Sequence, residues 1–544
     1  MAIETPYSKL NALIIDDMAV QQTTLRGQLT MLGIAKVDQA TSPDDAIRLA
    51  RRTKYALFLC DYNLNCKSDG QQLFEHLRDQ NLLAPDALFF MITAENSYAS
   101  VASASEHKPD AYLLKPTTAS DIEDRLKAQL EKRRALQPIT DRLAKQDGAG
   151  AVAACDAILA RKDRWFMQAL QHKGQALLNL GRHEDAKAVY LAALEARPQL
   201  VWAQLGLARA HKAAGRFDEA RVLAQDILQS PDGERNLAAY DLMAEALEAQ
   251  GDPQAAQWVL RDAATVVPSA KRMRLVADSA FRNGDLELAR DTLQQVAKAT
   301  AGAVTAQAQD NLTLAQTLVD LGQASDALPL LQNLNAQRLD PSLGSVTLAI
   351  QAQALALTGD AAGAAQAVAR ARENLRQAKA DFATVALAKA ELVTGHPEAG
   401  LKLLERAVSS DHENPRVKQL VRNALRQTGH EDKMDRLVEA AAEGLQRRVT
   451  DAKAMFRDSR IDDALVAIEA ALKDYPENTG VLLQAAQMNC LSLRLKKQLN
   501  ASVVERVRLY LMRLDKLMPG NDRVTQMQRY YRETVAALSE RVPA

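Results

Sequence analysis

The sequence predicts an α/β domain over residues 1–126, followed by an all-α array of stacked helical hairpins. Three observations support this prediction. Short apolar runs alternate with helix-periodic segments up to about residue 125. From residue 148 onward, punctuating glycines recur about every 34 residues. Aromatic residues make up only 4% of the chain, which favours packed helices over β-sandwiches.

Five short segments of the N-terminal domain are predicted to be strands, because they are apolar and bounded by turn residues. Amphipathic helical segments separate them. Strands that alternate with helices form right-handed crossovers, so we expect a doubly wound, five-stranded parallel sheet with helices on both faces. The expected strands are 11–15, 36–40, 55–60, 87–92 and 111–114.

Polar side chains follow four of these strands. Asp16 and Asp17 follow the first strand, Asp61 the third, Thr93 the fourth and Lys115 the fifth. Ligands of such sheets bind beyond the carboxyl ends of the strands, so these side chains should converge. Three neighbouring carboxylates repel one another unless a cation joins them, and a hard divalent ion such as Mg²⁺ suits their oxygens. One carboxylate could then be a nucleophile, as in aspartyl-phosphate chemistry.

This series of DD, D, T and KP at successive strand ends resembles the receiver domain of two-component response regulators, over roughly residues 10–130. The resemblance implies a flavodoxin-like fold with Asp61 as the phospho-acceptor. It also implies that Asp16 and Asp17 hold Mg²⁺ together with Asp61 and the backbone carbonyl of Asn63.

The resemblance assigns roles to further residues. Thr93 and Lys115 would contact the phosphoryl oxygens, and the Lys115–Pro116 peptide bond would be cis. Tyr112 occupies the family's switch-aromatic position. The positions that tune the lifetime of the acyl phosphate are Asn63 and Glu95.

The loop after Asp61 departs from the family pattern. Asn65 stands where the family usually has proline, and the pair Asp69-Gly70 comes eight residues after Asp61 instead of seven. The loop is therefore one residue longer, and it contains a cysteine, Cys66, that we expect to be exposed. We expect this loop to influence which kinase fits the domain.

Beyond residue 138, segments such as GRHEDA (181–186) and GRFDEA (215–220) recur. The glycine suits the end of the first helix of a hairpin, and the following residues start the second helix. A period near 34 residues indicates stacked helical hairpins. The clearest unit resembles the tetratricopeptide repeat at its small, turn, aromatic and terminal-proline positions. These positions are Gly174, Gly181, Ala186, Tyr190, Ala193 and Pro198.

We expect four parts in the chain. The receiver domain spans 1–126, and a helical connector that ends at Pro138 spans 127–139. About ten repeats that resemble tetratricopeptide repeats form a solenoid over 140–500. Two helices, at 501–518 and 521–541 within the segment 501–544, would cap the array, because the end of a solenoid needs a polar-faced lid.

Composition and motifs argue against several classes of function. The formal net charge is zero and no long basic face is evident, which argues against nucleic acid as a partner. The four cysteines form no CxxC pair, and neither a signal peptide nor a membrane span is evident, so we expect a cytoplasmic protein with reduced thiols. Signatures of an output enzyme are also missing. Beyond self-phosphorylation of the receiver and slow hydrolysis of its aspartyl phosphate, we expect no enzymatic activity.

The expected function is that of a response regulator. A histidine kinase would phosphorylate Asp61, and the repeats would bind a protein or peptide in their concave groove as the output. One alternative is a scaffold or phosphate sink that modulates a sensor kinase or another regulator independently of its own output. A second is a nucleic-acid-binding repeat protein. The sequence leaves open whether the chain forms a homodimer.

Overall fold

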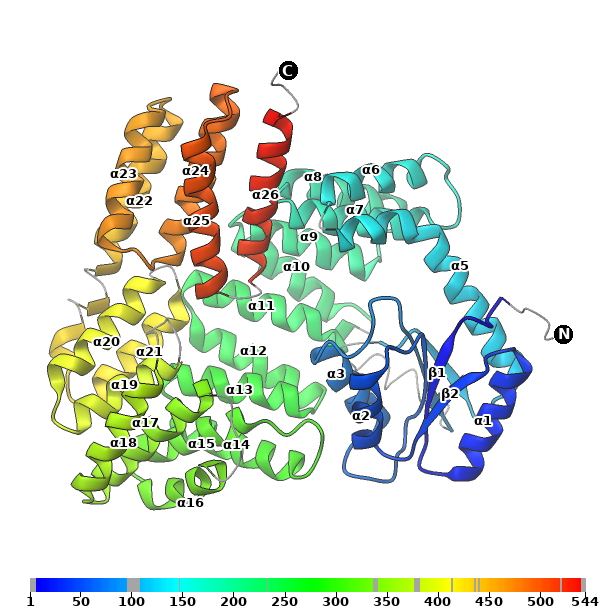
Figure 1. Cartoon of the computed structure of the whole chain (residues 1–544), viewed down its shortest axis with the longest axis horizontal. Helices are drawn as coiled ribbons and strands as arrows, with labels where there is room; N and C mark the ends of the chain where they lie inside the picture. Colours follow the sequence, from blue (N-terminus) through cyan, green and yellow to red (C-terminus); the bar gives the residue numbers. More distant parts are fainter. Residues whose placement is uncertain are drawn as a thin grey trace. The chain divides into compact units, whose positions relative to one another are not determined.

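The computed structural model, shown in Figure 1, divides into two compact units. One consists of Met1–Leu275 with Gln295–Gln307, and the other of Val276–Gln294 with Ala308–Ala544. The described residues are 6–94, 108–145, 147–231, 233–335, 341–375, 382–411, 414–434, 437–438, 441–518 and 521–539.

The N-terminal domain is built on a five-stranded parallel sheet with strand order β2-β1-β3-β4-β5. This confirms the predicted doubly wound α/β fold. Ile15, the last residue of β1, pairs with Ala40 on one side and Cys60 on the other, so the carboxyl ends of these strands are aligned. The strands are β1 (Asn11–Ile15), β2 (Lys36–Ala40), β3 (Leu57–Asp61), β4 (Leu88–Thr93) and β5 (Ala111–Leu114).

Helices cover both faces of the sheet. Leu29 of α1 and Ile122 of α5 belong to the apolar cluster on one face, and Ala46 of α2 and Leu73 of α3 to the cluster on the other. All residues of β3 and β4 are buried, as expected for strands covered on both sides. The helices are α1 (Ala19–Met31), α2 (Pro43–Arg52), α3 (Gly70–Asp79) and α5 (Ala119–Ala144).

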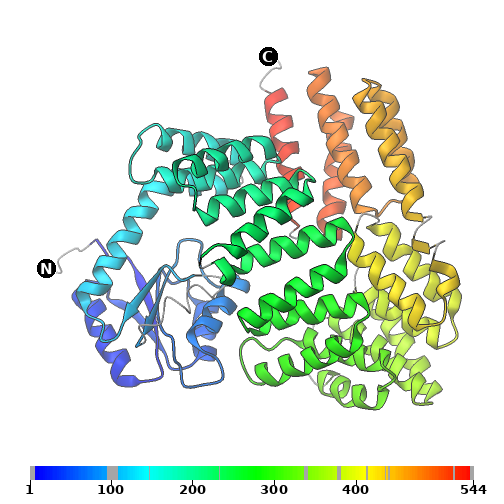
Figure 2. The same ribbon diagram turned by 180° about the vertical axis from the view of Figure 1, so that it is seen from behind.

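Helix α5 leads from the sheet into the first hairpins (Figures 1 and 2). We expected it to end at Pro138, and that expectation was wrong, because α5 continues to Ala144. A proline inside a helix removes one backbone hydrogen bond. Burial of Leu136 and Ile139 in a cluster with residues of α6 and α7 favours the helical path in spite of that loss. The receiver and the first hairpin therefore share one helix without a flexible tether.

Helices follow one another in hairpins beyond α5. The first hairpins and short connections are α6 (Gly148–Leu159), α7 (Phe166–Asn179), α8 (His183–Ala196), α9 (Val201–Ala213), α10 (Phe217–Gln229), η1 (Gly233–Arg235), α11 (Leu237–Gln250), α12 (Pro253–Val266), α13 (Ala270–Asn283) and α14 (Leu286–Thr300). The helices after them are α15 (Ala308–Asp320), α16 (Ala324–Asn335), α17 (Pro341–Leu357), α18 (Ala361–Asn374), α19 (Phe382–Val393), α20 (Pro397–Ser410), α21 (Pro415–Gln427), η2 (Glu431–Lys433), α22 (Ala441–Arg457), α23 (Ile461–Asp474), α24 (Thr479–Lys496), α25 (Ala501–Leu517) and α26 (Asp522–Ser539).

The repeated glycines end helices in a left-handed conformation, as the sequence predicted. Gly181 and Gly215 have φ of 71° and 77°. At the equivalent turn before α23 the residue is Ser459, and it takes a φ of 64° without the freedom of glycine. Glycines inside helices have another role. A Cβ added to Gly174 or Gly206 would lie 2.5 or 2.2 Å from the ring of Tyr190, so these glycines make room for that ring.

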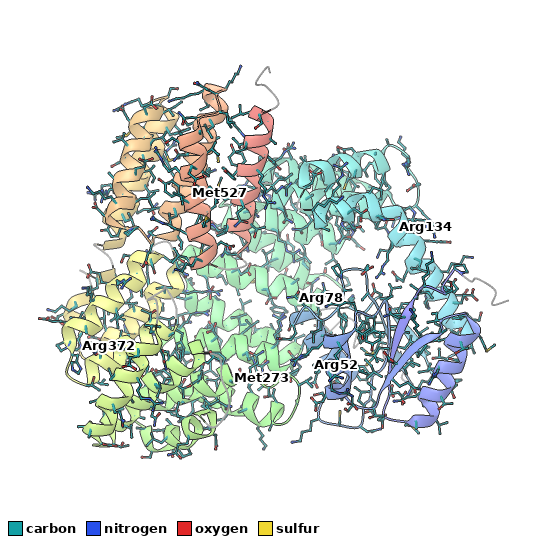
Figure 3. The ribbon with its side chains drawn as sticks, viewed as in Figure 1. Arg52, Arg78, Arg134, Met273, Arg372 and Met527 are labelled. Atoms are coloured by element: carbon teal, nitrogen blue, oxygen red, sulfur yellow. The ribbon has the colours of Figure 1, made fainter. Side chains whose placement is uncertain are left out.

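The last helices form their own apolar cluster, which joins residues of α22 to α26. Met527 of α26, labelled in Figure 3, is buried in it. The two terminal helices expected from the sequence are present as α25 and α26. Among the described residues, no helix combines the length and the apolar character needed to cross a bilayer.

Candidate functional site

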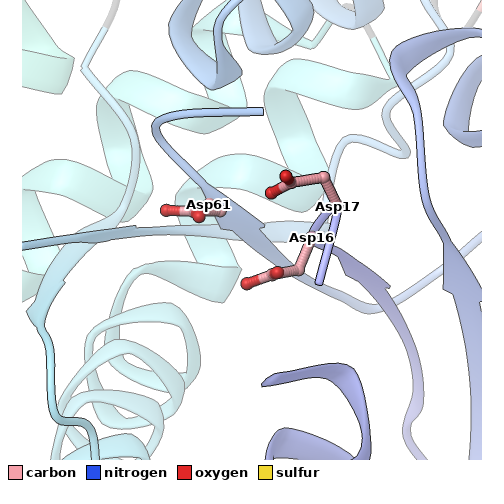
Figure 4. Close-up of side chains that lie close together, drawn as sticks. All are labelled: Asp16, Asp17 and Asp61. Atoms are coloured by element: carbon pink, nitrogen blue, oxygen red, sulfur yellow. The ribbon is translucent and has the colours of Figure 1, made fainter. Parts of the chain in front are cut away.

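Three carboxylates meet at the carboxyl ends of neighbouring strands. Asp16 and Asp17 follow β1, and Asp61 is the last residue of β3, which pairs directly with β1. Each of the three offers an oxygen, and these oxygens lie within 4.8 Å of one another (Figure 4). Asp16 and Asp61 are buried and Asp17 is partly exposed, so Asp17 is the most accessible of the three.

One lysine approaches this acidic group. The Nζ atom of Lys115 donates a hydrogen bond of 2.7 Å to Oδ2 of Asp61 and lies 3.8 Å from Oδ2 of Asp16. The backbone N–H of Lys115 donates to the carbonyl of Thr93, which holds the start of the loop after β5 against β4. The Lys115–Pro116 peptide bond is cis. Three carboxylates face one ammonium group, so the site has surplus negative charge at neutral pH.

Burial and the surplus charge both act on the Asp16 carboxyl. Burial raises the pKa of Asp16, and the neighbouring carboxylates Asp61 and Asp17 raise it further. The N–H of Met18, which donates to Asp16 Oδ1 at 2.8 Å, and the charge of Lys115 oppose that rise. Among the described residues, the other oxygen of Asp16 has no hydrogen-bond partner. A buried, unsatisfied carboxylate oxygen beside two further acids fits a hard divalent cation such as Mg²⁺.

Two of the remaining predicted site residues lie on β4 and β5. Thr93 is buried at the end of β4. Tyr112 of β5 is partly buried and packs against the apolar cluster under α2 and α3. Glu95, which we expected to tune the phosphoryl lifetime, lies outside the described residues.

The loop after Asp61 is tied to the acidic group. The side chain of Asn65 donates a hydrogen bond of 2.8 Å to Oδ2 of Asp17, and its N–H bonds to Oδ1 of Asn63 at 3.2 Å. Asn65 has a φ of 46°, a conformation that asparagine tolerates better than most residues. Proline, which cannot take a positive φ, would not fit the conformation of residue 65 here.

The end of this loop is fixed by the pair Asp69-Gly70. The side chain of Asp69 accepts a hydrogen bond from the N–H of Gln72 and caps α3. A Cβ on Gly70 would lie 2.2 Å from the backbone carbonyl oxygen of Asp61, so only glycine fits there. The glycine therefore lets α3 begin directly beside the end of β3.

Family models match the two regions that the geometry separates. Residues 12–127 match the response regulator receiver domain. Residues 177–246 and 242–304 match tetratricopeptide repeats. The chain carries a receiver domain followed by tetratricopeptide repeats. The family of the receiver is thus confirmed, with the acids Asp16, Asp17 and Asp61 inside the matched range.

Among solved structures, a tetratricopeptide repeat protein from Parabacteroides merdae matches 48% of this chain and 98% of its own length, at 11% identity and a TM-score of 0.31.

The repeats contain a hollow of about 310 Å³ between α23, α24 and α25. Leu465, Val466 and Leu493 supply apolar lining, and Val466 is 70% exposed. Asn489 also lines it and is fully buried. The amide of Asn489 donates to the carbonyl of Ala485 at 2.8 Å, and its Oδ1 has no hydrogen-bond partner in the part of the chain that the structure describes. The hollow therefore offers apolar surface to a ligand, whereas the unpartnered oxygen of Asn489 is buried beside it.

Sequence reasoning missed a buried ion pair in the repeats. Lys389 of α19 pairs with Asp320 of α15, and both side chains are almost completely buried. Amide side chains extend the network, because Gln316 donates to Asp320 at 2.8 Å and Lys389 donates to Gln427 at 2.7 Å, while Oδ2 of Asp320 has no hydrogen-bond partner among the described residues. Burial raises the pKa of Asp320, and the charge of Lys389 opposes that rise. The partners lie 69 residues apart in the sequence and on separate helices, so no local sequence pattern predicts the pair.

Proposed function

We propose that Asp61 accepts a phosphoryl group from a histidine kinase in the cytoplasm, and that the tetratricopeptide repeats bind a protein partner as the output. One observation carries the proposal. Asp61 ends a buried strand, receives the hydrogen bond of Lys115 and has two further carboxylates in reach. A receiver domain and repeats are signalling and binding modules, and the family match supports that combination.

The transfer itself needs one nucleophilic oxygen. An oxygen of Asp61 attacks the phosphorus of the phosphohistidine, a P–O bond forms, and the P–N bond breaks with its electron pair left on the imidazole nitrogen. In this proposal Lys115 and the hydroxyl of Thr93 contact the phosphoryl oxygens and offset their charge. Water later attacks the phosphorus and releases inorganic phosphate from Asp61.

The residues that would hold Mg²⁺ are Asp16, Asp17 and Asp61, with the backbone carbonyl of Asn63. When bound, the ion supplies charge neutralisation for the attacking carboxylate and the transferred group. Asp16 takes part only when ionised, and its pKa is raised by burial. We therefore expect phosphorylation to slow as the pH falls into the range where Asp16 takes up a proton.

Treatment with acetyl phosphate, a small phosphodonor, tests the phosphorylation. In the presence of Mg²⁺, intact-mass measurement should find one added phosphoryl group on the wild type and none on Asp61→Asn. Asp124→Asn is the matched control, because Asp124 is exposed on α5 away from the site. Label that persists on Asp61→Asn would refute the assignment of Asp61.

The output requires a partner that the repeats can hold. We propose that a peptide segment of the partner docks in the hollow between α23, α24 and α25, where the exposed Val466 contacts an apolar side chain. Val466→Glu should reduce quantitative capture of partners about tenfold, whereas Leu509→Glu, an exposed change on α25 outside the hollow, should not. Equal capture by both variants would remove the hollow from the proposal.

A further inference from the structure

The connection between α14 and α15 lies against the loop that follows Asp61. The segment Gln295–Gln307 belongs to the same compact unit as the receiver domain. Lys67 of the loop donates a hydrogen bond of 2.8 Å to the carbonyl of Ala301, and Oγ of the buried Ser68 accepts one of 3.1 Å from the N–H of Val304. Two neighbouring residues of the receiver loop thus bind the backbone of one turn of the repeats.

Apolar packing extends this contact. The side chain of Val304 packs against the apolar cluster of the receiver that includes residues of α2 and α3. Burial lowers the pKa of His76 on α3, and a hydrogen bond with the backbone of Val304 opposes that shift. Gly302 lies under the Lys67 side chain, since an added Cβ would be 3.0 Å from its Nζ and 3.2 Å from its Cδ. The turn is therefore fitted to the receiver by shape as well as by hydrogen bonds.

The connection is also longer than some of its counterparts. Residues 301–307 separate α14 from α15, as many as the residues 230–236 between α10 and α11, whereas only residues 197–200 separate α8 from α9. In the sequence this appears as a spacing of 38 residues between Gly284 and Gly322, against 34 between Gly181 and Gly215.

The far side of the turn is fixed as well. Arg274 of α13 donates a hydrogen bond of 2.6 Å to the carbonyl of Thr305, within the same compact unit. The added residues thus form an ordered turn that is held by the receiver on one side and by the repeats on the other.

The same loop reaches the acidic site at its other end. Asn65, two residues before Lys67, donates to Oδ2 of Asp17. Cys66 between them donates from its Sγ to the carbonyl of Ser68 at 3.0 Å, which keeps the loop compact. Only a few residues therefore connect Asp17 and Asp61 to the groups that bind the turn, so a change of charge at either acid acts close to those groups.

We propose that the loop of Asn65 to Ser68 docks on the turn of Ala301 to Val304 as the receiver's contact with its own repeats, and that phosphorylation of Asp61 releases this contact. The second half rests on the proposed function of Asp61. The one-residue extension of the loop, which the sequence assigned to kinase fit, acquires a second role as an intramolecular connector.

The direction follows from charge. The ammonium group of Lys67 bonds to a neutral carbonyl, and phosphorylation replaces the single charge of the Asp61 carboxylate with about two negative charges on the phosphoryl group, a net gain of about one at the root of the same loop. A charged acceptor competes better for an ammonium group than a neutral one does. The contact consists of few hydrogen bonds and one apolar side chain, so a modest change in charge suffices to shift its population.

Hydrogen–deuterium exchange of a peptide that covers residues 301–307 tests both halves on the full-length protein. In the absence of phosphodonor, Lys67→Ala and Gly302→Ala should each speed exchange about tenfold, because the turn loses its receiver contacts. Lys36→Ala, an exposed lysine on β2, and Gly215→Ala, a turn glycine with nothing within 4 Å of an added Cβ, are the matched controls. Unchanged exchange in Lys67→Ala and Gly302→Ala would overturn the docking.

Acetyl phosphate with Mg²⁺ should then speed the same exchange in the wild type and leave Asp61→Asn unchanged. Intact mass measured on the same samples separates the two proposals. Label on Asp61 with unchanged or slower exchange would overturn the release while the phosphorylation of Asp61 stands. Failure of the wild type to take up label would overturn the release together with the proposed function.

Discussion

Two buried aspartate–lysine pairs, one in each compact unit, show how the same residue types serve different ends. In the receiver, Lys115 faces Asp61 and Asp16, with Asp17 nearby, and its side chain is 24% exposed. In the repeats, Lys389 faces Asp320 alone, and both are nearly inaccessible. The first pair is unbalanced and open, which suits it to the proposed binding of a cation and a phosphoryl group. The second is balanced and closed, which suits it to hold helices together.

The balanced pair should be the most sensitive to loss of one partner. Lys389→Met leaves the charge of Asp320 buried without compensation, and we expect the free energy of unfolding of the repeats to fall by about 3–5 kcal/mol. Urea titration followed by circular dichroism measures this. The double variant Asp320→Leu/Lys389→Met should recover most of the loss, because it leaves no charge unpaired. A single variant as stable as the double one would contradict a structural role for the pair.

Loss of one charged side chain from the unbalanced site should raise the free energy of unfolding instead of lowering it. Asp16→Asn removes one of three repelling acids and keeps the Oδ1 acceptor for the Met18 N–H, so we expect a gain of about 0.5–2 kcal/mol in stability at neutral pH. Ionised Asp16 disfavours the folded state, so the gain is full above its raised pKa and disappears as the pH falls towards the ordinary value of 3.8.

A titration with Mg²⁺ tests whether the gain in stability of Asp16→Asn comes from relief of repulsion among the three acids. The ion should raise the thermal unfolding temperature of the wild type and have little effect on Asp16→Asn. If Asp16→Asn lowers stability and still responds to Mg²⁺, repulsion among the three acids does not destabilise the receiver. The contrast between the unbalanced site and the balanced pair then fails.

Loss of an exposed ion pair should change the free energy of unfolding least, and its value serves as the reference for the other two changes. Lys496 bonds to Asp462 at 2.6 Å, and its side chain is 47% exposed. Lys496→Met should cost only about 0.2–1 kcal/mol, because water screens exposed charges. The same urea titration provides the value. A loss as large as that of Lys389→Met would mean that burial does not decide the worth of these pairs.

The receiver site was largely predictable from the sequence, because parallel strands bring their carboxyl ends to one edge. Asp16 and Asp61 follow recognisable apolar strands, and strand pairing makes them neighbours without knowledge of any side-chain contact. The glycine turns were predictable for a similar reason, since a left-handed residue is needed wherever one helix turns into the next. Ser459 shows that the turn persists where the glycine is replaced.

Contacts between distant segments could not be read in the same way. The binding of Lys67 to Ala301 spans 234 residues, and neither residue belongs to a periodic pattern. The spacing of 38 residues between Gly284 and Gly322 indicated a longer connection, but not what it touches. The path of α5 through Pro138 was missed because burial of Leu136 and Ile139 outweighs a local rule about proline.

The central claim is that the unbalanced acidic group uses Asp61, and no other carboxylate, as its nucleophile. The most direct measurement locates the phosphoryl group. Protein treated with acetyl phosphate and Mg²⁺ is reduced with borohydride, which converts an aspartyl phosphate to homoserine, and the converted residue is mapped by tandem mass spectrometry. We predict conversion at residue 61 alone. Conversion at Asp16, Asp17 or any other carboxylate, or none in folded protein, would contradict the account.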